Sequence, residues 1–382
     1  MSTIYIPRFL GDAIQKLPQE KALVLFGARQ VGKTTLIQKL FDGTRTRWFS
    51  GDVAEDVAFL ESLTSQADLR VFLAGLETLI IDEAQRIPGI GLLLKRLVDA
   101  ESGVRIIVTG SSALELAGGV VESAAGRFFK EELWPISIEE LAKASSWLDV
   151  VRDIHERLVF GNYPYVIREP RFSKKTLEGL SDSVVFKDIF SISGIRKSEK
   201  FQRLVKLLAY NVGSLLSCDR LAQECGLSSA SVANYIDLLE QSFIVKTLTS
   251  YSRNLANELK KSKKVYFCDL GIRNAVIGDF SPFSSRSDSE RGALWENFFV
   301  IERFKYHAYR ETGAKLFFWR DKQKHEVDLI EALPDGSMQA FECKVTDDTI
   351  RAPKVFTKKY PECNFQVATT GNFYRYFTSS SN

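Results

Sequence analysis

Short apolar runs and helical segments alternate along the first third of the chain. Residues 22–26 form a continuous apolar run, which is typical of a strand buried on both faces of a parallel sheet. Residues 35–40 follow with the spacing of a helix, and apolar runs at residues 79–81 and 104–108 predict two further strands. This alternation predicts an N-terminal α/β domain with a doubly wound sheet.

Over residues 201–250 the pattern changes to three helices followed by a strand. The third helix is expected over residues 229–241, and a turn that contains Gly226 separates it from the helix before, as in a helix-turn-helix. Strands are expected at residues 243–248 and 264–268 and would form a hairpin beside the helices. This part of the chain therefore predicts a winged helix-turn-helix.

The last part of the chain is expected to hold a long helix and then three strands. The helix covers residues 291–306, and the strands cover residues 315–319, 326–331 and 338–345. A serine-rich stretch at residues 281–289, with a proline inside it, is the clearest linker candidate. Four parts are thus expected, over residues 1–145, 146–200, 201–280 and 285–382.

The composition is that of an ordinary globular protein and changes this picture little. The 382 residues are 45% hydrophobic and 26% charged, and the net charge of +3 is too small to indicate an obligate nucleic-acid binder. The five cysteines are scattered without CxxC spacing, and the three histidines lack zinc-ligand spacing. No apolar run approaches the length of a membrane span. We expect a cytoplasmic protein with reduced thiols and no membrane partner.

The strongest candidate for chemistry is the sequence GARQVGKT, which follows the first predicted strand and precedes the first predicted helix. In the pattern GxxxxGK[ST] the glycines let backbone N–H groups turn toward a phosphate, and the helix N-terminus adds a partial positive charge. Lys33 is expected to reach the β- and γ-phosphates of ATP, and Thr34 to hold Mg²⁺. The residues expected to bind the nucleotide are Gly27, Ala28, Arg29, Gln30, Val31, Gly32, Lys33, Thr34 and Thr35.

Polar residues at two strand ends complete this expected site. We expect Asp82 to position Mg²⁺ and Glu83 to polarise the water that attacks the γ-phosphate. The next strand ends near Thr109 and Ser111, which are expected beside the γ-phosphate because ligands collect at the carboxyl ends of parallel strands. Capping of a helix by Ser111 is an equally good interpretation.

Arg127, in the sequence AGRF, is a candidate arginine finger that acts in cis or on a neighbouring subunit. A surface ion pair is the more ordinary role for an arginine at a loop end. A finger that acts between subunits would require a homo-oligomer.

The middle part gives mixed indications about macromolecular partners. Its third helix contains no Lys or Arg, whereas helices that read DNA use cationic side chains for phosphate contacts. The expected wing is basic, with Arg253, Lys260, Lys261, Lys263 and Lys264. Contact with DNA through this hairpin and docking of a protein segment both stay open.

A second set of polar residues occurs in the C-terminal strands. Glu342 and Lys344 face the same side of one strand by its two-residue period, and Asp328 on the neighbouring strand is placed to face the same way. This set resembles the PD-(D/E)xK nuclease superfamily. The resemblance implies that Asp328, Glu342 and Glu296 hold Mg²⁺ and that Lys344 orients or deprotonates the attacking water. A cross-strand cluster of ion pairs is the alternative.

The order of sequences along the chain resembles a prokaryotic family of AAA-type P-loop ATPases, whose C-terminal half is a domain of unknown function with a nuclease-like fold. The resemblance rests on Arg8 and on GARQVGKTT, LIIDEAQ, VTGSS, AGRF, LWPISIEEL and FGNYP. Lys187 departs from the arginine common at that position, and lysine lacks the bidentate geometry of arginine. The resemblance implies ATP binding and hydrolysis.

We therefore expect an α/β fold with an AAA-like P-loop NTPase domain, a helical lid, a winged helix-turn-helix and a restriction-nuclease-like C-terminal domain. The preferred function is a molecular switch that binds and hydrolyses ATP, with Mg²⁺, and couples nucleotide state to the C-terminal half. Two alternatives stay open: a metal-dependent DNA nuclease that ATP regulates, and a non-catalytic scaffold that docks a protein partner.

Overall fold

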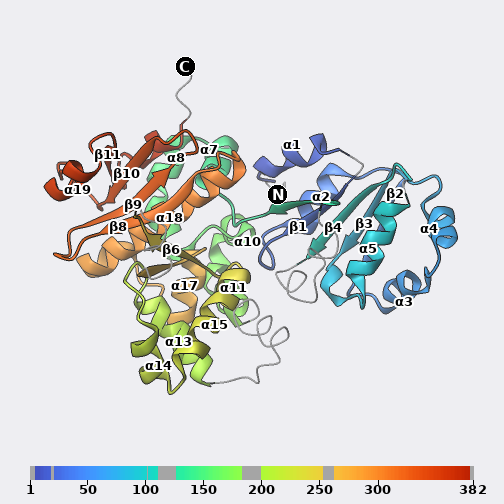
Figure 1. Cartoon of the computed structure of the whole chain (residues 1–382), viewed down its shortest axis with the longest axis horizontal. Helices are drawn as coiled ribbons and strands as arrows, with labels where there is room; N and C mark the ends of the chain where they lie inside the picture. The colour runs from blue at the N-terminus through green and yellow to red at the C-terminus, as the bar shows by residue number, and fades with distance from the viewer. Residues whose placement is uncertain are drawn as a thin grey trace.

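The computed structural model describes residues 5–18, 21–100, 102–110, 126–182, 199–252 and 262–378. Two sheets organise these residues, one in the N-terminal third and one in the C-terminal part, at opposite ends of the view in Figure 1. Helices of the connecting segment, α10 (Pro164–Arg168) among them, lie between the two sheets.

The N-terminal sheet has five parallel strands in the order β2-β3-β4-β1-β5. All five residues of β1 are buried, as expected for a strand that is covered on both faces. The parallel α/β sheet predicted from the apolar runs is confirmed. Its strands are β1 (Ala22–Phe26), β2 (Thr46–Ser50), β3 (Thr78–Asp82), β4 (Arg105–Gly110) and β5 (Phe128–Glu132).

Helices cover both faces of this sheet. Alternate residues of each strand point to opposite faces, so Leu23 and Leu25 of β1 pack with α1 and α2, whereas Val24 packs with α3, α4 and α5. The sheet is therefore doubly wound. These helices are α1 (Phe9–Lys16), α2 (Lys33–Leu40), α3 (Ala54–Ser62), α4 (Gln66–Leu73) and α5 (Ile90–Asp99).

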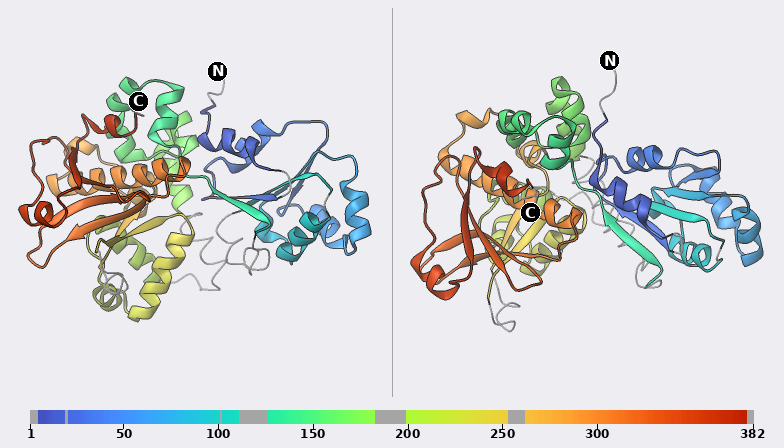
Figure 2. Two further views of the ribbon diagram at one scale, coloured as in Figure 1. Left: turned by 45° about the horizontal axis from the view of Figure 1, so that its top comes forward. Right: turned by 90° about the horizontal axis from the view of Figure 1, so that it is seen from above.

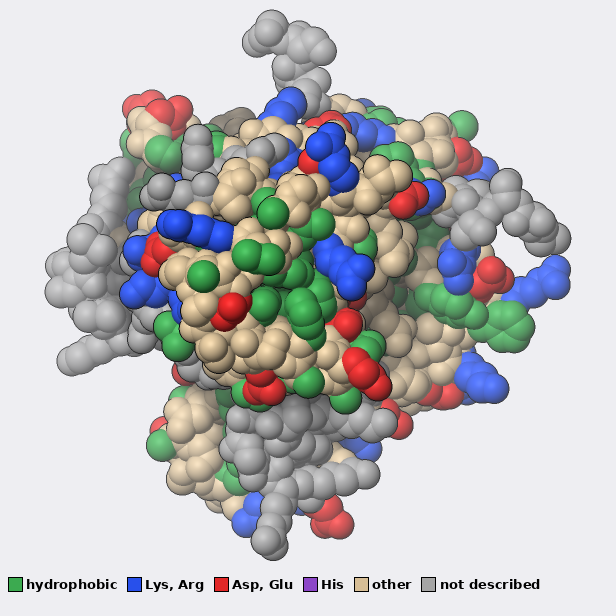
Figure 3. Space-filling model, turned by 90° about the vertical axis from the view of Figure 1, so that its right-hand side faces the viewer, with side chains coloured by type: hydrophobic (Ala, Val, Ile, Leu, Met, Phe, Trp, Pro, Cys, Tyr) green, Lys and Arg blue, Asp and Glu red, His purple; other side chains and the backbone are tan. Residues whose placement is uncertain are grey.

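The outer face of the N-terminal part carries charges of both signs around hydrophobic side chains (Figure 3). Val53, Phe59 and Val71, on and beside α3 and α4, are exposed there. Mixed charge of this kind differs from the single-sign basic surface that is typical of nucleic-acid binding.

The connecting segment is helical, as the sequence predicts for the lid. Its helices are α7 (Ile138–Ala144), α8 (Trp147–Arg152), α9 (Ile154–Phe160), α10 and α11 (Ser173–Ser181). Lys187, which the resemblance to the ATPase family singled out, lies outside the described residues. None of the helices within the described ranges is both long enough and apolar enough to cross a membrane.

The middle part contains the predicted helices α13 (Glu199–Tyr210), α14 (Cys218–Cys225) and α15 (Ser229–Gln241), followed by β6 (Val245–Ser250) and β7 (Lys263–Phe267). Gly226 ends α14 with a φ of 63°, a conformation that glycine adopts without strain. Ser228 then caps α15 by accepting a hydrogen bond from the backbone N–H of Ser231 at 3.1 Å. The turn between the helices thus has the local chemistry that the sequence indicates.

The β6–β7 hairpin is not a free wing. It continues the C-terminal sheet, whose order is β11-β10-β9-β8-β6-β7, because β6 pairs with β8 on the edge opposite β7. One continuous sheet therefore crosses the predicted boundary between residues 201–280 and residues 285–382. The remaining strands are β8 (Lys315–Arg320), β9 (Glu326–Ala332), β10 (Met338–Cys343) and β11 (Asn364–Ala368).

The long helix α18 (Asp288–Tyr309) lies along this mixed sheet (Figure 2, left). Its apolar side chains pack with residues of β9 and β10 in one buried cluster, which also takes in α9. The helix extends further in both directions than predicted. A short helix, α19 (Lys354–Lys359), precedes β11.

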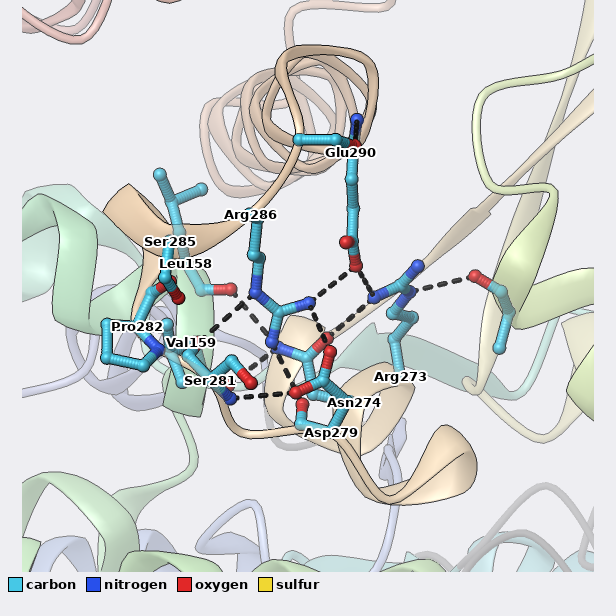
Figure 4. Close-up of polar contacts among 12 residues, drawn as sticks. Leu158, Val159, Arg273, Asn274, Asp279, Ser281, Pro282, Ser285, Arg286 and Glu290 are labelled. Carbon is cyan, nitrogen blue, oxygen red and sulfur yellow. Dashed lines mark hydrogen bonds and ion pairs between the residues drawn. The ribbon is translucent and has the colours of Figure 1, made fainter.

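The serine-rich stretch at residues 281–289 does not act as a loose linker. Arg286 is almost fully buried and pairs with Oε1 of Glu290 at 2.5 Å, and the same oxygen pairs with Arg273 at 3.0 Å (Figure 4). Arg273, on α17 (Leu270–Ile277), also donates to the carbonyl of Ala209 in α13 at 2.8 Å. This network fixes the middle helices to the start of α18, so the two parts form one packed unit.

Candidate functional site

The glycine loop between β1 and α2 requires its two glycines. Gly27 has a φ of 154° and Gly32 a φ of 98°, values that side chains disfavour. A Cβ atom at Gly27 would also collide with the backbone carbonyl of Leu133. The loop therefore keeps its backbone close to β5 and open toward the helix N-terminus, where an anion is favoured.

Lys33 directs its ammonium into this loop. The side chain is buried, and Nζ donates hydrogen bonds to the carbonyls of Gly27 at 2.8 Å and Ala28 at 3.0 Å. The positive charge thus already lies inside the loop that would surround a phosphate. This is the position that the sequence pattern predicts for it.

Thr34, Asp82 and Thr109 form a chain of hydrogen bonds that joins the start of α2 to the ends of β3 and β4. The Thr34 hydroxyl donates to Oδ2 of Asp82 at 3.0 Å, and the Thr109 hydroxyl donates to Oδ1 of the same carboxylate. A hydroxyl and a carboxylate at this edge are the hard oxygen ligands that Mg²⁺ prefers. The donor set therefore fits Mg²⁺ at Thr34 and Asp82. Ser111, predicted beside them, lies outside the described residues.

Glu83 follows Asp82 in a left-handed backbone conformation, with a φ of 50°. This conformation is uncommon for residues other than glycine and tends to occur at functional sites. Its carboxylate accepts a hydrogen bond from Nε2 of Gln85 at 2.5 Å, and its N–H lies 3.4 Å from the Thr109 hydroxyl oxygen. Glu83 is thus held beside the Thr34–Asp82 pair.

Arg127 is not close enough to the loop to act in cis. Because Phe128 pairs with Ala22 at the start of the parallel strand β1, Arg127 lies at the sheet edge opposite the loop. A five-residue strand, roughly 15 Å long, separates the two edges. Nε of Arg127 instead pairs with Asp99 at 2.8 Å on the surface. The interpretation as a finger in cis is therefore wrong for this arrangement, and action on a neighbouring subunit stays a prediction.

Three family models match successive parts of the chain. Residues 19–142, which contain the glycine loop, Asp82 and Glu83, match the model described as AAA domain. The N-terminal third is similar to this family of AAA domains. Residues 151–282 and 291–379 match two domains of unknown function, DUF8612 and DUF4143. The boundary between these two matches lies close to the predicted one, and neither family description names a nuclease or a winged helix.

Curated relatives match most of the chain at low identity. An uncharacterized protein of Mycobacterium tuberculosis is 28% identical over 344 residues, which are 88% of this chain and 72% of the relative. An uncharacterized protein of Haemophilus influenzae is 26% identical over 306 residues, which are 73% of this chain and 75% of the relative. The names of these two relatives do not state an activity.

Solved structures resemble the chain only weakly. A signal-transduction ATPase with a tetratricopeptide repeat sensor, from Pyrococcus horikoshii, has a TM-score of 0.28 at 12% identity; the match covers 80% of this chain and 47% of that one. Drosophila ORC bound to DNA has a TM-score of 0.27 at 14% identity, with 70% and 93% covered. The chain spans about half the length of the first of these. Likeness at this level says nothing about substrates or partners.

Arg8 connects the loop of the AAA domain to the C-terminal part of the chain. Its guanidinium is buried and donates to the Val31 carbonyl in the glycine loop at 2.8 Å, and its Nε pairs with Oε1 of Glu140 in α7 at 3.1 Å. Nη2 of the same group lies 3.4 Å from the hydroxyl of Tyr309, the last residue of α18. Burial alone would lower the pKa of Arg8, but Glu140 raises it above its ordinary value, so the guanidinium stays charged.

Sequence reasoning noted Arg8 without placing it and missed its partner Glu140. The usable signal was the sequence SIEE, since Ser137 and Glu140 form a capping box at the start of α7. The same Glu140 carboxylate that caps the helix also receives Arg8.

The C-terminal residues Glu296, Asp328, Glu342 and Lys344 lie close together beside the mixed sheet. Burial, followed by the nearby Asp328, raises the pKa of Glu296 to about 7. Lys344 pairs with Oε1 of Glu342 at 2.7 Å. Lys264, which we expected to be part of a solvent-facing basic wing, lies at the centre of the set. Only 2% of its side chain is exposed.

Proposed function

We propose that this chain is a molecular switch that binds and hydrolyses ATP and transmits its nucleotide state to the C-terminal part through Arg8. The observation that carries the ATPase assignment is the hydrogen-bonded pair Thr34–Asp82 beside the buried ammonium of Lys33. Together these groups provide a phosphate ligand and a magnesium ligand set at one sheet edge.

Each of the chain's own groups has a distinct task in hydrolysis. Lys33 binds the β- and γ-phosphates and neutralises charge on them, and the loop N–H groups add further donors. Thr34 and Asp82 would hold Mg²⁺, which neutralises phosphate charge when bound. Glu83, held by Gln85, accepts a hydrogen bond from the attacking water and orients it toward the γ-phosphate.

The contacts of Arg8 support the coupling part of the proposal. One guanidinium joins the Val31 carbonyl of the loop, Glu140 of α7 and Tyr309 of α18, and all of its polar contacts are buried or half-buried. A shift of the loop backbone on phosphate binding would change the contact of Arg8 with the Val31 carbonyl and would thereby strain its contacts with Glu140 and Tyr309. One element of the connecting segment, α7, and one of the C-terminal part, α18, thus contact the same group.

The experiment combines ATP affinity, ATP turnover and hydrogen exchange on the full chain with and without a non-hydrolysable ATP analogue. For the wild type we expect the analogue to change exchange in the loop and also in α7 and the end of α18. Arg8→Ala should retain a response in the loop but lose the response in α7 and α18.

Arg310→Ala is the matched control for this test. Arg310 also joins the end of α18 to α7, through paired hydrogen bonds to Glu139 at 2.6 and 2.7 Å, but among the described residues no contact links it to the loop. We expect it to leave ATP affinity unchanged. An Arg8→Ala protein that still transmits the analogue's effect to α18 would rule out this route, and undetectable ATP binding by the wild type would refute the ATPase assignment itself.

A further inference from the structure

The carboxylate cluster of the C-terminal sheet is built around the ammonium of Lys264, which comes from the β6–β7 hairpin. Nζ lies 2.8 Å from Oε1 of Glu296 and 2.5 Å from Oε1 of Glu326. Oδ1 of Asp328 lies 3.9 Å away from the same nitrogen. The ammonium therefore stands between two of the three carboxylates that the nuclease resemblance assigns to a metal ion.

Lys264 cannot withdraw easily from this position. It occupies the β7 ladder opposite Leu248 of β6, so its backbone is fixed, and its side chain is almost fully buried. Its ammonium also lies over the ring of Phe318 in β8, 5.4 Å from the centroid. Rotation away from the carboxylates would leave an unpaired charge in apolar surroundings, which is strongly unfavourable.

Several oxygens of the cluster already accept from other donors, although Oε2 of Glu342 is buried without a hydrogen-bond partner among the described residues. Oε1 of Glu296 also accepts from the Tyr266 hydroxyl at 2.7 Å, and Oδ2 of Asp328 accepts from the backbone N–H of Cys343 at 2.8 Å. The other oxygen of Glu326 pairs with Arg320 at 2.7 Å. A divalent ion would need several oxygens at once, and Oε1 of Glu296 and Oε1 of Glu326 already face the Lys264 ammonium.

The charges of the cluster nearly balance without any metal ion. Four carboxylates, Glu296, Glu326, Asp328 and Glu342, face three cations, Lys264, Lys344 and Arg320. A divalent ion would add two positive charges within a few ångströms of the Lys264 ammonium and would be repelled by it. In the described part of the chain, no group of three or more Asp, Glu, His or Cys side chains is arranged to hold a metal ion.

We infer that Lys264 is a built-in cation that takes the place of a divalent metal in this cluster, so that the C-terminal domain is locked to the β6–β7 hairpin and does not work as a metal-dependent nuclease. The set of residues predicted as a second metal site, Glu296, Asp328 and Glu342 with Lys344, does not fit a metal while Lys264 is present. The cluster instead joins two parts of one sheet.

Binding of Mn²⁺ to the full-length protein without nucleotide, followed by electron paramagnetic resonance, tests this inference. We expect the wild type and Asp328→Asn to bind the same number of ions, because the cluster holds none in either. Lys264→Ala removes the resident cation and should gain one bound ion per chain, and the double variant Lys264→Ala/Glu296→Gln should lose it again.

Two results would overturn the inference. One is a wild type that binds an ion which Asp328→Asn no longer binds. The other is a folded Lys264→Ala protein that gains no ion. Circular dichroism checks the fold, and Lys264→Met, which keeps the apolar stem, replaces the alanine variant if that variant does not fold. If neither variant folds, the comparison of ion binding by the wild type and by Asp328→Asn still tests the inference. None of these measurements depends on ATP hydrolysis, so they stand apart from the proposed switch.

Discussion

The hydroxyl of Thr34 donates a hydrogen bond to Oδ2 of Asp82 at 3.0 Å, although 48 positions separate the two residues in the chain. Thr34 is the second residue of α2, the helix after β1, and Asp82 ends β3, with β4 lying between these strands. The carboxyl ends of parallel strands meet at one edge, and that geometry brings the two oxygen ligands together.

Loss of the Thr34 hydroxyl or of the Asp82 charge should abolish the magnesium dependence of ATP binding. Thr34→Val keeps the shape of the side chain but loses the hydroxyl, and Asp82→Asn loses the charge. We expect both to bind ATP with an affinity that added Mg²⁺ no longer increases, as measured by calorimetry. Thr64→Val, at an exposed threonine of the same domain, is the control and should behave like the wild type. A Thr34→Val protein with normal magnesium dependence would exclude this site.

Glu83→Gln should separate binding from hydrolysis. The amide keeps the size of the side chain but cannot accept the proton of the attacking water, so we expect turnover to fall by about 10²- to 10⁴-fold with ATP affinity retained. Phosphate release gives the rate, and Glu55→Gln, an exposed glutamate on α3, serves as control. Undiminished turnover would show that another group activates the water.

Arg127→Ala should leave ATP turnover of the isolated subunit unchanged. Arg127 pairs with Asp99 at the far edge of the sheet, with both side chains more than one third exposed, and exposed pairs contribute about 1 kcal/mol or less to stability. Turnover measured across a range of protein concentrations adds the test of action between subunits. A rate per subunit that rises with concentration in the wild type, and not in Arg127→Ala, would support that prediction.

The sequence was informative where backbone geometry and residue type are tied together. The loop from Gly27 to Thr34 needs glycine at fixed positions, and buried parallel strands need continuous apolar runs, so both could be predicted from local patterns. The carboxyl ends of those strands then placed Asp82 and Glu83 correctly beside the loop. The interpretation of Arg127 as a finger in cis was wrong because the sequence alone does not show that β5 runs parallel to β1, which places Arg127, just before β5, at the edge opposite the loop.

Long-range burial of charge was beyond such reasoning. Lys264 stands next to Lys263 in a basic run, and only the pairing of β6 with β8 shows that it points into the C-terminal sheet while Lys263 is exposed. The role proposed for Arg8 likewise depends on its contact with Tyr309, which is 301 positions away in the chain. A single chain read in order gives no sign of contacts at that separation.

The buried pair Arg303–Glu331 should make an acid-sensitive contribution to stability. Two nitrogens of Arg303 donate to the two oxygens of Glu331 at 2.6 and 2.7 Å, and Nε2 of His307 lies 3.1 Å from the second oxygen. Burial alone would raise the pKa of Glu331, but the Arg303 guanidinium and the hydrogen bonds from Arg303 and His307 lower it below its ordinary value.

The sign of the pH effect follows from that lowered pKa. The folded protein holds the Glu331 proton more weakly than the unfolded chain, so the contribution is fully present above the unfolded pKa of about 4.3 and is lost as the pH falls through the folded pKa. Denaturant unfolding at pH 7 and at several values below 5 measures it. We expect the wild type to lose more stability over this range than Glu331→Gln loses.

At pH 7, Glu331→Gln should cost about 3–5 kcal/mol, because it leaves the buried Arg303 without a counter-charge. Glu77→Gln is the matched control: Glu77 also pairs with an arginine, Arg45, but its side chain is 58% exposed, and its loss should cost about 1 kcal/mol or less. Glu331→Asp, which keeps the charge, covers the case in which the glutamine variant does not fold. Equal costs for Glu331→Gln and Glu77→Gln would mean that the buried pair contributes no more than a surface pair.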